Sequence, residues 1–276
     1  MRGLPLRPTP SRPPLTMLFL LSPAKRLDYD TPVPAELAAL ATAPKFMAEA
    51  AALIDVMKAK TPVQVARLMD LSDELAALNV ARYAAWRPRN TERNSRPAVL
   101  AFAGDVYEGL QAGTLATEDL AWAQQHVVIL SGLYGALRPL DRLQPYRLEM
   151  GTAVATERGR NLYDYWGDTV AAYLNQRQRG ERAPVIVNLA SQEYSRTALR
   201  PALKARVVEC VFEEGKGGQY KIVSFFAKKA RGMMARFAIE QRLQDPAALR
   251  EFDEDGYGFV KALSTDDRLV FRRTAA

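Results

Sequence analysis

Apolar positions along the chain form either short continuous runs or longer stretches with helical spacing. The first run, residues 17–21, stops at Ser22-Pro23 and is too short for a helix, so it predicts a buried strand over 18–21. Similar runs predict strands at 98–103, 127–130, 185–189, 207–212 and 220–226. A last apolar run at 269–271 predicts an additional edge strand.

Helical spacing governs residues 35–86, where Ala, Leu and Met recur three and four positions apart. Two breaks in this stretch carry capping signals. Thr61 precedes a proline, which is favoured at the first helical position, and Ser72 offers a hydroxyl to the free amides of the next helix. Residues 87–96 are polar and predict a loop, and further helices are predicted near 117–125, 163–178 and 227–244.

This mixture predicts an α+β (mixed α/β) fold with a central mixed sheet or partial barrel surrounded by helices. Residues 1–16 hold five prolines, three arginines and no acid, which predicts a disordered extension. Met17 opens the first strand, so a natural start at Met17 is an alternative. No repeat or linker follows, and residues 17–276 are predicted to form a single compact domain. No secretory signal or membrane helix is predicted.

Composition narrows the function classes. Of the 276 residues 48% are hydrophobic, which excludes a disordered or fibrous chain. One cysteine and one histidine exclude a disulfide framework and a structural zinc site, so neither a metal nor a cofactor is expected. The net charge of +7 favours polyanionic partners, but it falls to +4 without the three arginines of residues 1–16. The position of the basic residues therefore matters more than their number.

Polar side chains follow several predicted strands directly. Ser22 and Lys25 follow the first strand, Asp105 follows the strand at 98–103, and Ser191 follows the strand at 185–189. A lysine beside a serine can act as a base or hold an anion. Each of these residues also has an ordinary structural interpretation, as a turn residue, a surface lysine or a helix cap.

Two arginines lie in a glycine-containing segment after the strand at 127–130. The forked donors of Arg138 and Arg147 suit phosphate or carboxylate groups, although this segment matches neither the dinucleotide fingerprint nor the Walker pattern. Both arginines could equally pair with Asp141 and Glu149 and serve only the fold.

Basic residues gather between 221 and 236, where five occur without an acid: Lys221, Lys228, Lys229, Arg231 and Arg236. Lys228 and Arg231 lie three residues apart and share a face of a predicted helix. Such a stripe is typical of contacts to a phosphate backbone, and a solvated helix face is the alternative.

Together these segments resemble the YaaA family of bacterial peroxide-stress proteins. The matching stretches are SPAKRLDYD at 22–30, FAGDVYEGL at 102–110, LSGLYGALRPLDRLQPYRLEMG at 130–151, LYDYWGD at 162–168, NLASQEY at 188–194 and KIVSFFAKKARGMMARF at 221–237. They run in family order over essentially the whole chain from Met17. Arg26 stands where relatives often have threonine, which leaves the SPAK match intact.

The resemblance implies a cytoplasmic protein that limits peroxide damage by lowering free intracellular iron. It also implies binding to double-stranded and bubble DNA through a positive cleft and a helix-hairpin-helix element. Residues 61–76 fit that element best, but Asp70-Leu71-Ser72-Asp73 replaces the usual hairpin glycines. Two aspartates oppose a phosphate electrostatically, so the phosphate contact of this hairpin is in doubt.

Two functions from different classes follow. The first is a DNA-binding stress-protection protein whose positive cleft is lined by Lys25, Arg138, Arg147, Lys228, Lys229 and Arg231. The second is an enzyme acting on a small anionic substrate, with a polar cluster of Ser22, Lys25, Asp105, Arg138 and Ser191. A reaction site needs its hydroxyls and carboxylates within hydrogen-bond reach, whereas DNA binding needs only a positive surface. No sequence pattern defines the oligomeric state.

Overall fold

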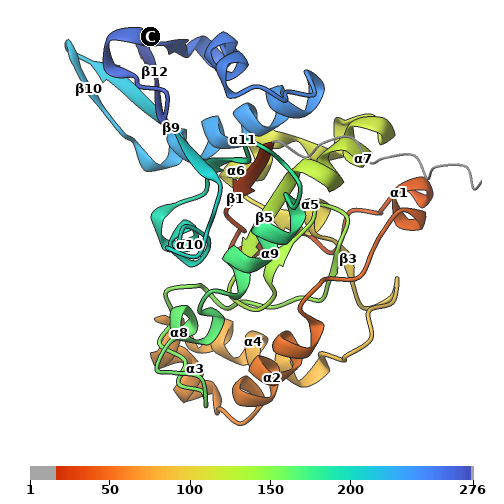
Figure 1. Ribbon diagram of the computed structural model, residues 1–276. Coiled ribbons are helices and arrows are strands. Elements are labelled where there is room, and N and C mark those ends of the chain that lie inside the picture. Colours follow the sequence, from red (N-terminus) through yellow and green to blue (C-terminus); the bar gives the residue numbers. More distant parts are fainter. Residues whose placement is uncertain (1–16, 275–276) are drawn as a thin grey trace, which may run out of the picture.

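The computed structural model describes residues 17–274, so the extension predicted for residues 1–16 lies outside the described residues. The fold is a single mixed α/β domain built on an eight-stranded sheet with the order β11-β12-β9-β8-β1-β5-β6, in which β10 also pairs with β9 (Figure 1). Five neighbouring strands are parallel: β1 (Met17–Leu21), β5 (Val127–Ser131), β8 (Val185–Leu189), β9 (Arg206–Lys216) and β12 (Arg268–Thr274). Three antiparallel strands complete the sheet: β6 (Gly135–Leu137), β10 (Gln219–Lys221) and β11 (Gly258–Phe259).

Helices cover the sheet and form a separate group at one end of it. Figure 1 shows α2, α3 and α4 together below the sheet, while α11 crosses its upper part. The helices are α1 (Ala35–Ala39), α2 (Met47–Lys58), α3 (Pro62–Met69), α4 (Asp73–Ala85), α5 (Ala98–Ala101), α6 (Asp105–Leu110), α7 (Thr117–His126), α8 (Leu162–Trp166), α9 (Thr169–Arg177), α10 (Gln192–Ala198) and α11 (Ser224–Glu240). Short 3-10 helices lie at Ala112–Thr114, Pro246–Glu251, Glu254–Gly256 and Lys261–Leu263, and two small strand pairs join β2 (Arg26–Leu27) to β4 (Phe102–Ala103) and β3 (Arg96–Pro97) to β7 (Arg142–Leu143).

The strands of the parallel core are buried on both faces. Every residue of β1, β5 and β8 is buried, which explains why they appear in the sequence as continuous apolar runs without alternation. The strand predictions at 18–21, 127–130, 185–189 and 207–212 are confirmed.

The predicted breaks in the helical stretch 35–86 are also confirmed. Thr61 forms a capping box with Gln64 at the start of α3, and the Ser72 hydroxyl accepts the amide of Leu75 at the start of α4. Asp70 ends α3 in the left-handed conformation, with φ of 51°. Aspartate tolerates this conformation better than most residues, so a three-residue connection reverses the chain without glycine.

Three strand predictions and one helix prediction are wrong in part. Residues 98–101 form α5, and only 102–103 extend as β4, because a short apolar run does not distinguish a buried helical turn from a strand. The strand predicted over 220–226 ends at Lys221, and α11 begins at Ser224. The last strand, β12, is not at the edge, because β11 pairs with its outer side. The helix at 163–178 is divided at Gly167, whose φ is 45°.

No helix among residues 17–274 combines the length and apolar character needed to cross a membrane.

Candidate anion-binding site at the carboxyl edge of the sheet

Two serines meet where parallel strands β1 and β8 end. Ser22 follows β1 and Ser191 follows β8, and the backbone amide of Ser191 donates to Ser22 Oγ at 2.8 Å. The Ser22 hydroxyl donates in turn to Ser191 Oγ at 3.3 Å. The chain passes from β1 to β5 on one side and from β8 to β9 on the other, so the strand order reverses between β1 and β8. Open α/β sheets bind ligands in the crevice at such a topological switch point.

A cavity of about 280 Å³ opens beside these serines. We call it the switch-point pocket, and its polar lining includes Ser22, Lys25, Asp105, Ser191, Lys228 and Arg231. The lining comes from four distant segments, namely the ends of β1 and β8, the start of α6 and the first half of α11. The fold therefore brings together candidate residues that the sequence spreads over more than two hundred positions.

Close contact between α6 and α11 places the pocket's charged residues. A Cβ atom on Gly109 of α6 would lie 2.1 Å from the Lys229 carbonyl oxygen, and one on Gly232 of α11 would lie 1.8 Å from the Val106 carbonyl oxygen. Only glycine allows the two backbones to approach this closely. The approach brings Lys228 Nζ to 3.9 Å from Asp105 Oδ2 at the pocket wall.

Positive charge exceeds negative charge among the side chains named above. Lys228 has Asp105 as a counter-ion, and Lys25 Nζ lies 3.5 Å from Glu149 Oε1 while its side chain remains 68% exposed. Arg231 makes no ion pair at contact distance within the described part of the chain, and burial lowers the pKa of its guanidinium more than the longer-range effects of Cys210 and Glu209 raise it. A partly desolvated cation without a counter-ion is stabilised by an anion that enters the cavity.

The two serine hydroxyls bond to each other and to backbone in the described structure. The Ser191 amide is the backbone donor, and in the described residues neither hydroxyl bonds to a histidine or a carboxylate. Tyr107 donates its hydroxyl to the Ser22 carbonyl oxygen at 3.0 Å, and burial raises the pKa of Tyr107 well above its usual range. The neutral phenol is a hydrogen-bond donor at this position and not a base.

Arg147 lies next to the pocket, in a hollow shared with Lys25 and Tyr194. Its guanidinium donates to Glu149 Oε1 at 2.9 Å, so Arg147 and Lys25 share one carboxylate oxygen. The other oxygen, Glu149 Oε2, is buried without a hydrogen-bond partner. Sequence reasoning treated Glu149 only as a partner of Arg147 and did not foresee its contact with Lys25.

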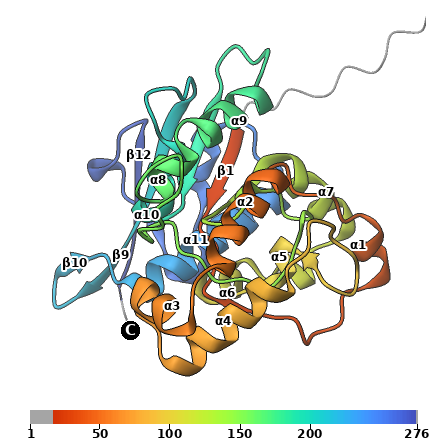
Figure 2. The ribbon, with the colours of Figure 1, turned by 90° about the horizontal axis from the view of Figure 1, so that it is seen from below.

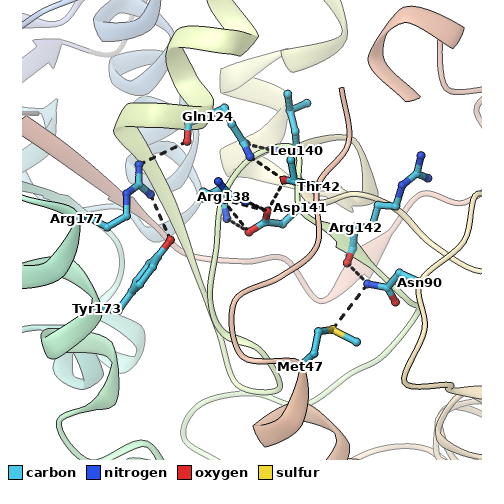
Figure 3. Close-up of polar contacts among 10 residues, drawn as sticks. All are labelled: Thr42, Met47, Asn90, Gln124, Arg138, Leu140, Asp141, Arg142, Tyr173 and Arg177. Atoms are coloured by element: carbon cyan, nitrogen blue, oxygen red, sulfur yellow. Dashed lines mark hydrogen bonds and ion pairs between the residues drawn. The ribbon is translucent and has the colours of Figure 1, made fainter. Parts of the chain in front are cut away.

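Arg138 lies elsewhere, in a buried polar network that Figure 3 shows. Its guanidinium reaches Asp141 Oδ1 at 2.9 Å, and the same carboxylate accepts the Thr42 hydroxyl at 2.6 Å. Arg138 lines a separate cavity of about 370 Å³ together with Lys45 and Arg177. The pairings with Asp141 and Glu149 that the sequence left open are therefore present in the structure.

Lys229 also points away from the switch-point pocket. Its Nζ lies 3.8 Å from Asp255 Oδ2, beside the ion pair of Arg273 with the same carboxylate. Of the candidates, Ser22, Lys25, Asp105, Ser191, Lys228 and Arg231 share one pocket, Arg147 borders it, and Arg138 and Lys229 are separate. Arg26 and Glu193 line the pocket too; both lie in the stretches that carry the family resemblance, but neither was predicted as a site residue.

Soft metal ligands are dispersed in the described structure. Between residues 17 and 274 no group of three or more His, Cys, Asp or Glu side chains is placed to hold a metal ion. Cys210 is buried in β9, and burial raises the pKa of its thiol to about 12. His126 is buried and stacks on Trp122 with ring centroids 3.8 Å apart.

The geometry defines a mixed α/β protein with a cation-lined pocket at the switch point of its sheet. A family model described as peroxide stress protein YaaA matches residues 17–263, and the chain belongs to this family. Three similar proteins carry the name UPF0246 protein. The one from Leptothrix cholodnii is 64% identical over 260 residues, covering 94% of this chain and 100% of its own length. The one from Bordetella avium is 61% identical, covering 93% of this chain and 99% of its own length. The one from Paracidovorax citrulli is 60% identical, covering 94% of this chain and 100% of its own length.

Proposed function

We propose that this protein protects the cell under peroxide stress by binding double-stranded and distorted (bubble) DNA through the switch-point pocket. The convergence of Lys25, Lys228 and Arg231 on one cavity carries the proposal. These residues come from two segments about two hundred positions apart in the sequence, and Arg231 makes no ion pair at contact distance within the described residues, since Glu209 acts on it only at longer range. Phosphate groups of DNA supply the missing negative charge and release counter-ions from the nucleic acid.

Two further arginines, Arg147 and Arg82, lie on the side of the pocket next to α4, and Arg147 is paired with Glu149. Arg147 borders the pocket, and its carbonyl oxygen accepts the Tyr83 hydroxyl of α4. Burial lowers the pKa of the nearby Arg82, a further cation of α4. A DNA backbone that leaves the pocket on this side would meet α4 next.

In this proposal α3 and α4 act as a helix-hairpin-helix-like element with a secondary role. Their connection contains Asp70 and Ser72 and leads into Asp73, the first residue of α4. The two carboxylates repel a phosphate, so the hairpin is assigned to orientation of the duplex and the pocket to its main electrostatic contacts. Cytoplasmic location and the lowering of free iron, which the YaaA resemblance implies, belong to the same proposal.

The test is fluorescence anisotropy of labelled duplex and bubble DNA across a salt series, with the chain starting at Met17. Replacing Lys228 and Arg231 together by glutamine keeps their stems and removes two charges. We expect weaker binding and a salt slope reduced by about two, roughly one for each lost phosphate contact.

The matched control replaces Lys45 and Arg179 by glutamine, which removes the same charge from outside the pocket. Control and test variants must melt within a few degrees of the parent chain, so that unfolding is not mistaken for lost contacts. An unchanged affinity and slope in the Lys228→Gln/Arg231→Gln protein, or an equal loss in the control, would remove the pocket from the DNA-binding surface.

A second candidate function is an enzyme acting on a small anionic substrate. It is favoured by the position of Ser22, Asp105 and Ser191 at the carboxyl ends of parallel strands, where α/β enzymes hold their substrates. It is disfavoured by the absence of a base bonded to either serine within the described residues. Failure to bind DNA, together with a higher melting temperature in inorganic phosphate, would favour this second function.

A further inference from the structure

A cluster of apolar side chains remains exposed where β10 ends and α11 begins. We call it the aromatic rim, and it consists of Tyr220, Ile222, Phe225 and Phe226. Ile222 is 56% exposed and Phe225 is 51% exposed, although both are large and apolar. Figures 1 and 2 show the hairpin of β9 and β10 projecting from the body of the molecule. Tyr220 belongs to β10, and the other three rim residues follow it along the chain into the start of α11.

The rings of the rim are held from the protein side by arginines. The Arg273 guanidinium lies 4.6 Å from the Phe226 ring centroid, and the Arg272 guanidinium lies 4.2 Å from that of Tyr220. Phe225 packs edge to face on Phe226 with centroids 5.4 Å apart. These contacts restrain the rings and leave surface of Phe225 open to solvent.

Phe225 is the rim residue nearest the switch-point pocket along α11, whereas Phe226 lies on the side of Arg273 and Lys229. Phe225, Lys228 and Arg231 follow one another at intervals of three residues, which places them along neighbouring turns with a rise of about 4.5 Å per step. Lys228 and Arg231 line the pocket, and Phe225 lies one step nearer the start of the helix. If a DNA strand is held by its phosphates at the pocket, its neighbouring bases would therefore lie beside Phe225.

Charge around the rim favours a polyanion over an apolar partner. Residues 215–239 contain no acid and six bases: Lys216, Lys221, Lys228, Lys229, Arg231 and Arg236. In the fold, Glu213, Glu214 and Asp255 pair with Arg272 and Arg273 behind the rings. Lys216 and Lys221 make no ion pair among the described residues and leave the hairpin side of the rim positive. Exposed aromatic rings flanked by lysine and arginine are the arrangement on which unpaired bases stack in single-strand-binding proteins.

We infer that the aromatic rim, with Phe225 at its centre, stacks unpaired bases of distorted DNA next to the pocket that holds the strand's phosphates. The inference rests on the proposed DNA-binding function and adds the physical basis for choosing a bubble over a duplex. Bases in a duplex are stacked on each other and do not expose their faces, whereas bases in a bubble can leave the stack.

The experiment compares duplex and bubble DNA of the same length with Phe225→Ala, Phe225→Leu and Phe225→Trp proteins. Phe225→Ala and Phe225→Leu are expected to weaken bubble binding roughly tenfold, since the loss of one stacked base is worth about that factor, and to leave duplex binding unchanged. Phe225→Trp retains a ring and is expected to keep bubble binding, with its indole fluorescence quenched by the bubble. Leu40→Ala, at a site 40% exposed and on a different helix end, is the matched control.

The outcomes separate this inference from the proposed function. Unchanged bubble binding in Phe225→Ala, or an equal loss for duplex and bubble, overturns the stacking role while leaving DNA binding in place. A parent chain that binds no duplex but whose Phe225→Trp form is quenched by single-stranded DNA overturns the duplex proposal and supports stacking. A change of oligomeric state in Phe225→Ala without a change in DNA affinity shows that the rim contacts a second copy of the chain.

Discussion

At the scale of single residues, the same side chain has different roles because its neighbours differ. Arg138 and Arg231 both carry a forked cation, but Asp141 lies three residues from Arg138 and neutralises it inside the fold. Arg231 has no such partner among the described residues and faces a cavity. The pairing of Arg138 with Asp141 could be suspected from the sequence. The environment of Arg231 depends on α6, β1 and β8, so it could not be predicted from the sequence.

Cys210 illustrates how burial limits reactivity. The thiolate is the form that reacts with peroxide and with alkylating reagents, and burial raises the pKa of Cys210 to about 12. At pH 8 only about one thiol in ten thousand is ionised if the pKa is four units higher. The lone cysteine of this peroxide-stress family member is therefore protected by the core.

We predict that Cys210 in the folded protein is neither alkylated by iodoacetamide nor oxidised by hydrogen peroxide at pH 8. Mass spectrometry of intact protein would follow both reactions over time. The same protein in concentrated urea should be labelled once, which serves as the control for reagent quality. Labelling of the folded protein at the rate of the unfolded chain would contradict the buried position.

At the scale of elements, the contact between α6 and α11 connects packing to the pocket. Gly109 and Gly232 let the helices touch backbone to backbone, and Asp105 and Lys228 then meet at the pocket wall. Helical spacing in the sequence indicates α11, but nothing in it indicates that two glycines more than one hundred residues apart face each other. For the same reason the local sequence pattern predicted strands at residues 98–101 and at Phe225-Phe226, where the structure has helices. Tertiary contacts decided between helix and strand at both places.

Gly232→Ala is predicted to lower stability by about 1–3 kcal/mol or more, because its new methyl group would overlap the Val106 carbonyl oxygen. This is a net loss, because the cost of the overlap outweighs the roughly 1 kcal/mol that alanine gains over glycine in a helix. Urea unfolding followed by circular dichroism measures the change. Gly113→Ala is the control, since nothing lies within 4 Å of a Cβ atom there, and equal stability of the two variants would contradict the close helix contact.

At the scale of the whole molecule, a core rich in buried tyrosines links stability to pH. Desolvation is the main cause that raises the pKa of nine tyrosines: Tyr29, Tyr83, Tyr107, Tyr134, Tyr146, Tyr163, Tyr165, Tyr194 and Tyr257. In the unfolded chain these phenols ionise near pH 10. Stability from this source is complete below about pH 10 and declines as the pH rises further, because the unfolded state then loses protons that the folded state retains.

We predict one cooperative alkaline transition in which tyrosine ionisation and loss of helical circular dichroism coincide. Each buried tyrosine lowers stability by roughly 1.4 kcal/mol per pH unit between its unfolded and folded pKa values, so several together give a steep transition. Phenolate absorbance and circular dichroism recorded on the same samples provide the comparison. Ionisation of most tyrosines near pH 10 in a protein that is still helical would contradict their burial.

Much of the whole architecture could be predicted from the chain. Continuous apolar runs predicted the parallel core strands, and Thr61 and Ser72 predicted the starts of α3 and α4. The strand order could not be predicted, because runs such as β1 and β8 look alike and nothing local states which strands are neighbours. The convergence of Ser22 with Ser191 depends on that order alone.

The central strand also constrains when the protein can become active during synthesis. β1 comes first among the described strands, yet its partners in the sheet are β5 and β8, and Met17 aligns with Val185. One edge stays unpaired until β5 has been made, and the other until the ribosome has reached β8 at residues 185–189 of 276. Unpaired nascent strands of this kind need protection from aggregation. The pocket needs Lys228 and Arg231 as well, so a chain truncated before α11 would present its serines without the cations that give the site its charge.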